Sequence, residues 1–305
     1  MDLVTALLTS TVTMAVPLLL AALGELLAER AGVINVGLEG VILTGAFGAM
    51  LATYFSGSAL LGVLAAVTSG MALGGLFALA VVRQNANQVV AGVALNLLAV
   101  GITGVGYRAV FGVTGAALTV GGIAPIGVPL LAQLPMVGAA FFNQTAIGYV
   151  AFGLVPACAV FVTRTVPGLQ LRMAGENPHA AAAQGIAVTR VRSLALLACG
   201  ALAGLAGADL AIVYARTFVE GMSAGRGFIA LAIVIFGRWS PWGILAAALL
   251  FGLATALQFH FQALALAVPY QFFLMLPYVV TLAALTVSAG TPRAPAALGQ
   301  PYLRE

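Results

Sequence analysis

The chain has 305 residues, of which 62% are hydrophobic and 7% are charged, and its net charge is +4. An average soluble domain carries roughly 25% charged residues, so this composition excludes a soluble protein and predicts an integral membrane protein. All twelve basic residues are arginines spread along the chain, with no basic arm, so a nucleic-acid surface is also excluded.

Apolar runs recur along the chain, most of them long enough as helices to cross a hydrocarbon core of roughly 30 Å. They predict an all-α polytopic membrane protein, a bundle of about nine transmembrane helices, rather than a β-barrel. Two runs are short and follow glycine-rich polar stretches, which is typical of broken or re-entrant helices: Val41–Phe55 and Ala224–Gly237. In chain order the predicted spans are Val4–Gly24, Val41–Phe55, Ala59–Val81, Val89–Tyr107, Thr145–Thr163, Ser193–Ala215, Ala224–Gly237, Pro241–His260 and Pro269–Ser288.

The arginines predict the orientation. If the spans alternate and residues 164–192 are cytoplasmic, nine of the twelve arginines lie inside and only Arg108, Arg216 and Arg226 lie outside. By the positive-inside rule the N-terminus is then outside and the C-terminus inside. No positive residue precedes the first apolar run, so we expect a retained span rather than a cleaved signal peptide.

Residues 108–144 form the largest predicted external connection. The segment is rich in glycine and proline yet apolar, so we expect it to lie on the membrane surface or to dip into it, either meeting a partner or serving only as a cover.

Two segments of the chain, Val33–Phe47 and Val219–Gly237, are weakly similar to each other, since in each a polar, glycine-rich stretch precedes a short helix. Inverted repeats, as in many transporters, are one interpretation.

Five polar residues near the predicted cytoplasmic side are candidates for the translocation path. The stretch Glu29–Gly40 (ERAGVINVGLEG) places charges at the start of a helix, and it is read either as a gating break lining the path or as a helix cap. Asn96 lies two turns inside its span, so its amide bonds either a neighbouring helix or a solute. The candidates are Asn35, Glu39, Asn87, Gln88 and Asn96.

A group of charged residues lies at the predicted outer end of the sixth span. Asp209, Arg216, Glu220 and Arg226 could pair with one another or dock an external binding protein. The sequence contains no Ser/His/Asp arrangement, no HExxH, no CxxC and no phosphate-binding GxxxxGK[ST] motif, so we expect neither catalysis nor a bound metal or cofactor in this chain. Cys158 and Cys199 are predicted to be reduced packing residues.

Residues 164–192 are the one long polar and basic loop. Asn177 is a helix N-cap, Pro178 a first helical residue and Gly185 a stop, which together predict a two-turn helix. So short a helix needs docking for stability, and its alanine face fits a groove on another protein. The predicted coupling residues are Gly175, Glu176, Asn177, Pro178, Ala181, Ala182, Gly185 and Ile186.

The sequence resembles the permease subunits of bacterial ATP-binding-cassette importers in the branched-chain amino acid and ribose group. The segments GENPHAAAAQGI, NQVVAGVALNLLA and GMSAGRGFIALAIVIFGRWSPWG carry the resemblance, which favours the nucleoside-uptake branch. It implies about ten helices in a single transmembrane permease domain over residues 1–305, with residues 164–192 as the cytoplasmic coupling loop.

The resemblance also implies the partners and the mechanism. The partners are a second homologous permease, an ATP-binding-cassette ATPase that holds ATP and magnesium, an extracytoplasmic substrate-binding protein, a nucleoside or sugar as solute, and the lipid of the bacterial cytoplasmic membrane. The implied mechanism is alternating access. The alternatives are an importer of simple sugars such as ribose, and an ion-coupled secondary transporter, for which Asp209 and Glu39 are the candidate ionisable residues.

Overall fold

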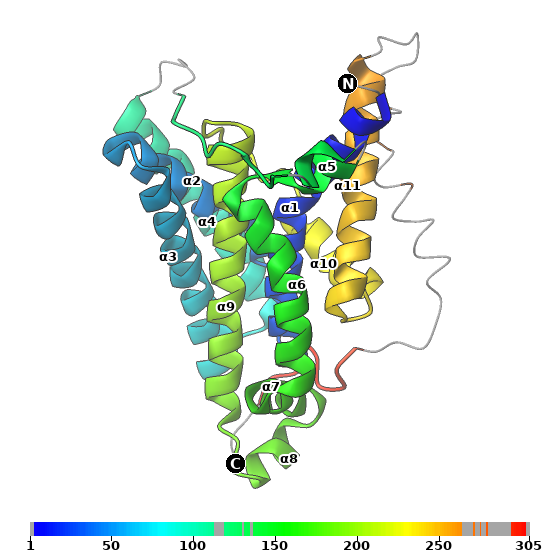
Figure 1. Cartoon of the computed structure of the whole chain (residues 1–305). Coiled ribbons are helices and arrows are strands. Elements are labelled where there is room, and N and C mark those ends of the chain that lie inside the picture. Colours follow the sequence, from blue (N-terminus) through cyan, green and yellow to red (C-terminus); the bar gives the residue numbers. More distant parts are fainter. Residues whose placement is uncertain are drawn as a thin grey trace.

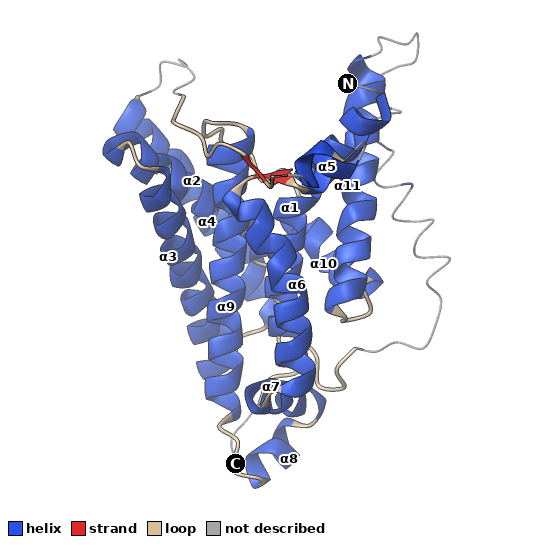
Figure 2. Cartoon of the chain, in the orientation of Figure 1, coloured by secondary structure: helices blue, strands red, loops and turns tan. Residues whose placement is uncertain are grey.

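The computed structural model describes residues 3–112, 119–129, 131–134, 137–263, the single positions 271, 275 and 279, and residues 294–302. These residues form a helical bundle with one short antiparallel strand pair at one end (Figures 1 and 2). The α-helices are α1 (Leu3–Arg30), α2 (Leu38–Ser56), α3 (Ala59–Ala78), α4 (Gln88–Phe111), α5 (Val137–Phe141), α6 (Ala146–Arg164), α7 (Val166–Glu176), α8 (Pro178–Ala183), α9 (Val188–Ala208), α10 (Arg226–Phe236) and α11 (Pro241–Ala263).

Two helices continue into wider π-helical turns, and the loop between α4 and α6 holds the remaining short elements. The π-helical segments are η1 (Leu79–Arg83), after α3, and η3 (Asp209–Tyr214), after α9. In the loop, β1 (Ile126–Gly127) pairs with β2 (Asn143–Gln144), and η2 (Leu131–Gln133) is a single 3₁₀ turn. This loop, predicted as the external connection, lies over the end of the bundle that carries the start of α1 (Figure 1).

The predicted spans agree with the described helices except at some of their ends. Seven described helices are long and apolar enough to cross a membrane, namely α1, α2, α3 with η1, α4, α6, α9 with η3, and α11, which confirms a polytopic all-α membrane fold. The short helix expected over Ala224–Gly237 is the 11-residue α10. The span Pro269–Ser288 lies outside the described residues, apart from positions 271, 275 and 279.

The largest differences lie at polar helix ends. The sixth span was predicted to begin at Ser193, but α9 begins at Val188 and includes Arg190 and Arg192. The second span was predicted as short, but α2 has 19 residues because Leu38, Glu39 and Gly40 belong to the helix. The first span was ended at Gly24, but α1 continues to Arg30 and takes Glu25 and Glu29 with it. Hydropathy ends a span at a carboxylate, whereas tertiary hydrogen bonds let the helix continue through one.

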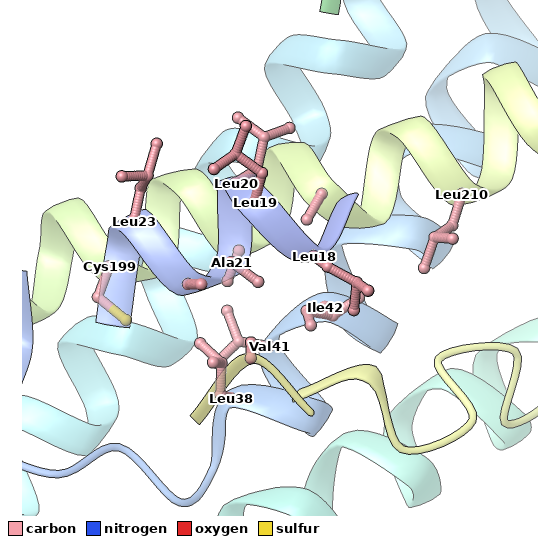
Figure 3. Packing of buried hydrophobic residues seen from close by; sticks show 14 of the residues in the cluster. Leu18, Leu19, Leu20, Ala21, Leu23, Leu38, Val41, Ile42, Cys199 and Leu210 are labelled. Atoms are coloured by element: carbon pink, nitrogen blue, oxygen red, sulfur yellow. The ribbon is translucent and has the colours of Figure 1, made fainter. Parts of the chain in front are cut away.

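The core surrounds α1 and α9, the two most buried of the long helices. Leucines of α1 gather with Leu38, Val41 and Ile42 of α2, and Cys199 and Leu210 contribute to the same cluster (Figure 3). In contrast, α4 is the least buried span, and most of its large apolar side chains are exposed, whereas Leu95 reaches the core. The interior packing is therefore organised by α1 and α9.

Helices α3 and α9 approach each other through glycines. Gly70 and Gly74 on α3 face Gly200 and Gly204 on α9, and a Cβ atom built on Gly70 would lie 2.8 Å from the Cα atom of Gly204. Both helices thus carry the GxxxG spacing that allows backbones to meet closely in a membrane. At these positions a glycine is required by the contact itself.

Candidate coupling surface and interior polar cluster

The segment predicted for coupling consists of two short helices, α7 and α8, at the end of the bundle opposite the N-terminus (Figure 1). Asn177 ends α7 and begins α8, and its side-chain oxygen accepts a hydrogen bond of 3.0 Å from the amide of Ala180. Pro178 is the first residue of α8, and Gly185 follows the helix with a positive φ of 81°. The predicted N-cap, first residue and stop of this short helix are all confirmed.

The alanines of α8 divide between two faces. Ala181 is fully buried in a small cluster with Ala174 and Val188, and Ala182 packs beside it. Ala180 and Ala183 are exposed. We call the exposed set the coupling surface, and it consists of Glu176, Asn177, His179, Ala180, Ala183 and Gln184. Coupling by residues 175–186 stays a prediction, but the side chain of Ala181 packs inside this chain and Pro178 is also buried.

The remaining predicted coupling residues fix the position of α8. Gly175 allows α7 to touch the end of α1, because a Cβ atom there would collide with the backbone carbonyl of Arg30. The carboxylate of Glu176 accepts a hydrogen bond of 3.2 Å from the amide of Ala296, and the amide of Ile186 donates to the carbonyl of Ala181 over 3.1 Å. These contacts make α7, α8 and the C-terminal segment 294–302 one packed unit.

Arg192 joins this unit to the bundle, a role that sequence reasoning missed. Its side chain is only 2% exposed, and its guanidinium donates to the carbonyls of Ala31 (3.0 Å), Gln300 (2.9 Å) and Ala174 (3.4 Å). Ala31 directly follows α1, and Ala174 lies in the last turn of α7, where helix carbonyls without partners favour a cation.

We expect Arg192→Met to loosen the C-terminal segment, because it removes the guanidinium and leaves the carbonyls of Ala31, Ala174 and Gln300 without this donor, the first two of them buried. The amides of Ala297 and Gly299, which bond the carbonyls of Gly175 and Gly32, should exchange with deuterium at least ten times faster, since a charged hydrogen bond contributes about 1.5–3 kcal/mol. The exposed Arg190 supplies the control Arg190→Met. Equal exchange in both variants would contradict this role of Arg192.

The loop between α1 and α2 turns back into the bundle instead of staying at its surface. The amide of Asn35 donates to Glu25 over 2.8 Å, and Glu25 lies five residues before Arg30, the last residue of α1. The amide of Gly40 donates to the side chain of Asn96 over 2.8 Å, and Asn96 lies eight residues after Gln88, the first residue of α4. At a rise of 1.5 Å per residue, these contacts lie about 7 Å from the end of α1 and about 12 Å from the start of α4, measured along each helix. The helix α2 therefore begins inside the bundle.

The predicted path residues bond the backbone of this loop. Asn96 also donates to the carbonyl of Val36 over 3.0 Å, and the side-chain oxygen of Gln88 accepts from the amide of Ile34 over 2.9 Å. Asn35 is fully buried, with its side-chain oxygen 3.1 Å from the amide of Gly37. Asn87 is exposed and caps α4. A role of these residues in translocation stays a prediction.

Glu39 connects the two helices that begin inside the bundle. Its two carboxylate oxygens accept hydrogen bonds from the amides of Gly225 and Gly227, each of 2.7 Å, at the start of α10. The carboxylate therefore satisfies amide groups at the N-terminus of α10 and meets the positive end of its dipole. Of the two interpretations of this residue, the structure describes a cap, although on another helix. The repeat relationship between the two glycine-rich segments stays a prediction.

Two buried acids in α1 and one cysteine complete the interior cluster. The thiol of Cys199 donates to Glu25 over 3.4 Å and lies 3.7 Å from the side-chain nitrogen of Asn35, so this cysteine is not a purely apolar packing residue. The indole N–H of Trp239 donates to Glu29. Cys158, in contrast, belongs to the apolar core. The hydrophobic pattern predicted the helices around this cluster but not its polar partners.

The charged group at the opposite end of the bundle does not pair as the sequence suggested. Glu220 accepts two hydrogen bonds of 2.9 Å from Arg108, which lowers the pKa of the Glu220 carboxyl. Arg226 donates to the backbone carbonyls of Met222 and Ser223. Asp209 is 3% exposed and forms no ion pair or hydrogen bond within the described part of the chain. The predicted mutual pairing was therefore wrong for Glu220.

These features together define a polytopic membrane protein: a bundle of apolar helices, two helices that begin inside it, and a packed pair of short helices at one end. In agreement with this class, residues 7–285 match the family described as branched-chain amino acid transport system permease component. The chain belongs to this family.

Several relatives match nearly the whole chain. It is 41% identical to a putative glucose ABC transporter permease protein of Haloferax volcanii, over 88% of this chain and 81% of the relative. It is 36% identical to a guanosine ABC transporter permease protein of Bacillus subtilis, over 97% and 95%. The identity with a nucleoside ABC transporter permease protein of Lactococcus lactis subsp. cremoris is 35%, over 94% and 93%. No solved structure matches the chain.

Proposed function

We propose that the chain is the permease subunit of an ATP-driven importer of nucleosides. The observation that carries the proposal is the similarity to guanosine and nucleoside permeases over almost the full length of both chains. ATP and magnesium bind a separate ATPase subunit, and an extracytoplasmic binding protein delivers the solute. The protein lies in the bacterial cytoplasmic membrane with its N-terminus outside and α8 inside.

The coupling mechanism follows from how α8 is held. Movement of the ATPase displaces α7 and α8 as one body, since Gly175, Glu176 and Arg192 fix them to the end of α1 and to residues 294–302. The displacement reaches α2 through the hydrogen bond between Glu25 and Asn35, and reaches α10 through Glu39. A path between this chain and a second, homologous permease then opens to alternate sides.

Simple sugars are the second candidate solutes. The relative with 41% identity is named as a putative glucose permease, so the solute class follows from a difference in pathway side chains within one family. A nucleoside contains a pentose, and the two candidates therefore share the hydroxyl chemistry that the protein must recognise.

Uptake by membrane vesicles tests the function. We expect vesicles with the assembled complex to accumulate labelled guanosine only with internal ATP and the ATPase subunit, and glucose or ribose should not compete at equal concentration. Uptake that continues without the ATPase and follows an ion gradient would identify an ion-coupled carrier. Efficient uptake of the sugar in place of guanosine would identify a sugar importer.

The coupling surface has its own test. We expect Ala180→Glu and Ala183→Glu to reduce co-purification of the ATPase at least tenfold, because burying an unpaired carboxylate in an interface costs several kcal/mol. Ala124→Glu places the same charge on an exposed alanine at the other end of the bundle and should leave co-purification unchanged. Membrane insertion of all three variants is the further control, and unchanged assembly of the α8 variants would remove the coupling proposal.

A further inference from the structure

Asp209 is an unpaired acid inside the bundle, and the coupling mechanism does not use it. It is 3% exposed and is the first residue of the π-helical segment η3, in which the helical turns are wider than in α9. Among the described residues, no hydrogen bond or ion pair reaches its carboxylate. Burying an ionisable group without a partner is costly, and in membrane proteins such groups face cavities where they meet a ligand or an ion.

The carboxylate lines a cavity of about 160 Å³ at the end of the bundle where α1 begins. Residues of α1 and η3 form one side, and the segment around β1 and β2 covers it. Beside Asp209, the polar side chains in its wall are Thr9, Thr13, Asn143, Gln144, Thr145 and Arg216. Polar residues thus come together here from three parts of the chain that are distant in sequence.

The part of the wall formed by α1 and η3 offers hydrogen-bond acceptors. The hydroxyls of Thr9 and Thr13 donate to the carbonyls of Thr5 (2.8 Å) and Thr9 (2.9 Å) within α1, so their oxygens keep lone pairs for a ligand. The carboxylate of Asp209 adds two oxygens, and Arg216 supplies donors at the exposed rim. A cation would face Arg216 and an anion would face Asp209, whereas a neutral solute with several hydroxyls would match both.

The volume limits the ligand. At ~30 Å³ for each water, 160 Å³ corresponds to about five water molecules. Sites for drug-sized ligands enclose about 300–1,000 Å³, so the cavity holds a pentose-sized group and excludes a base together with its sugar. A carboxylate accepts from two adjacent hydroxyls at once, which is the arrangement that a vicinal diol presents.

We propose that Asp209 and its cavity form a subsite for the hydroxyl groups of the solute's sugar, with the carboxylate accepting from a vicinal diol. The inference rests on the proposed function for the class of solute and for the assignment of this end of the bundle to the outside. It goes further by assigning sugar recognition to residues of α1, η3 and the 119–145 segment.

The test removes the hydroxyls from the solute and the carboxylate from the protein, separately and together, and compares the rates of uptake. In vesicles with the assembled complex, we expect 2′,3′-dideoxyguanosine to be taken up about ten- to hundredfold less efficiently than guanosine, in kcat/KM, because hydrogen bonds to a charged group are lost. In D209N this discrimination should fall to about threefold or less. The control E220Q also removes one acid at this end of the bundle, outside the cavity, and should discriminate as the wild type does.

Equal discrimination in D209N and the wild type would overturn the inference. If D209N does not assemble, Thr13→Val takes its place, because it removes a wall oxygen without changing the size of the side chain. If the wild type takes up ribose or glucose but not guanosine, the nucleoside proposal fails, and the same comparison is made with that sugar and its deoxy analogues.

A measurement without transport completes the test. The variant Thr13→Cys places a thiol in the cavity wall, where a small thiol reagent reports occupancy in the membrane-embedded chain. We expect D-ribose in large excess over the guanosine used for uptake to slow the modification, and we expect this protection to disappear when D209N is added. Modification that neither D-ribose nor guanosine slows would overturn the subsite whatever the vesicles transport.

Discussion

Gly204→Leu is expected to prevent the bundle from assembling. A Cβ atom on Gly204 would collide with the backbone carbonyl of Ala66 and lie 3.2 Å from the Cα atom of Gly70 on α3. These neighbours are backbone atoms, which cannot move aside as a side chain would. Overpacking a close contact costs about 1–3 kcal/mol, and a rigid helix crossing lies at or above the upper end of that range. The measurement is the yield of monodisperse protein after detergent extraction, with its unfolding temperature.

A matched control exists in the same kind of helix. Gly153 lies in the spanning helix α6, and a Cβ atom there would meet no described atom within 4 Å. We expect Gly153→Leu to leave the unfolding temperature unchanged or raise it, because leucine is a better helix former than glycine. Equal losses for Gly153→Leu and Gly204→Leu would show that the glycine crossing does not limit stability.

Glu39→Ala should be the most damaging substitution of a single polar side chain. It leaves the amides of Gly225 and Gly227 without acceptors at a helix start that lies inside the protein. An amide that loses its partner there costs about 1–3 kcal/mol, so the two together lower the free energy of unfolding by roughly 2–6 kcal/mol. Thermal unfolding followed by the fluorescence of Trp239 and Trp242 measures the loss.

Two further variants separate the cap from a general effect of charge. Glu39→Gln keeps the length of the side chain and one acceptor oxygen, so its loss of stability should be intermediate. Glu220→Ala removes an acid from the exposed pair with Arg108, where screening by solvent leaves little to lose. A change for Glu220→Ala as large as for Glu39→Ala would contradict the assignment of Glu39 as the α10 cap.

Local sequence patterns were sufficient to predict the helices and the limits of α8. Hydropathy located the described spans because a helix in lipid must satisfy its own backbone, which leaves few other structures for a long apolar run. Asn177, Pro178 and Gly185 predicted the limits of α8, since a cap and a stop act on amides within three or four residues. The division of the α8 alanines into buried and exposed was not predictable, because it depends on α7 and Val188 packing on one side.

The hydrogen-bond partners of the interior polar residues could not be predicted from the sequence, for a different reason. The spacing GxxxG on α3 and α9 was a readable signal for the close crossing, whereas nothing in the local sequence joins Glu39 to Gly225, 186 residues later, or Arg192 to Ala31, 161 residues earlier. By itself the sequence determined a polytopic membrane protein with a capped two-turn helix in its longest polar loop, because those features follow from composition and from contacts within one or two turns. Only the tertiary structure decided which carboxylates cap a helix and which one, Asp209, is left facing a cavity, because hydrogen-bond partners are chosen by how the helices pack.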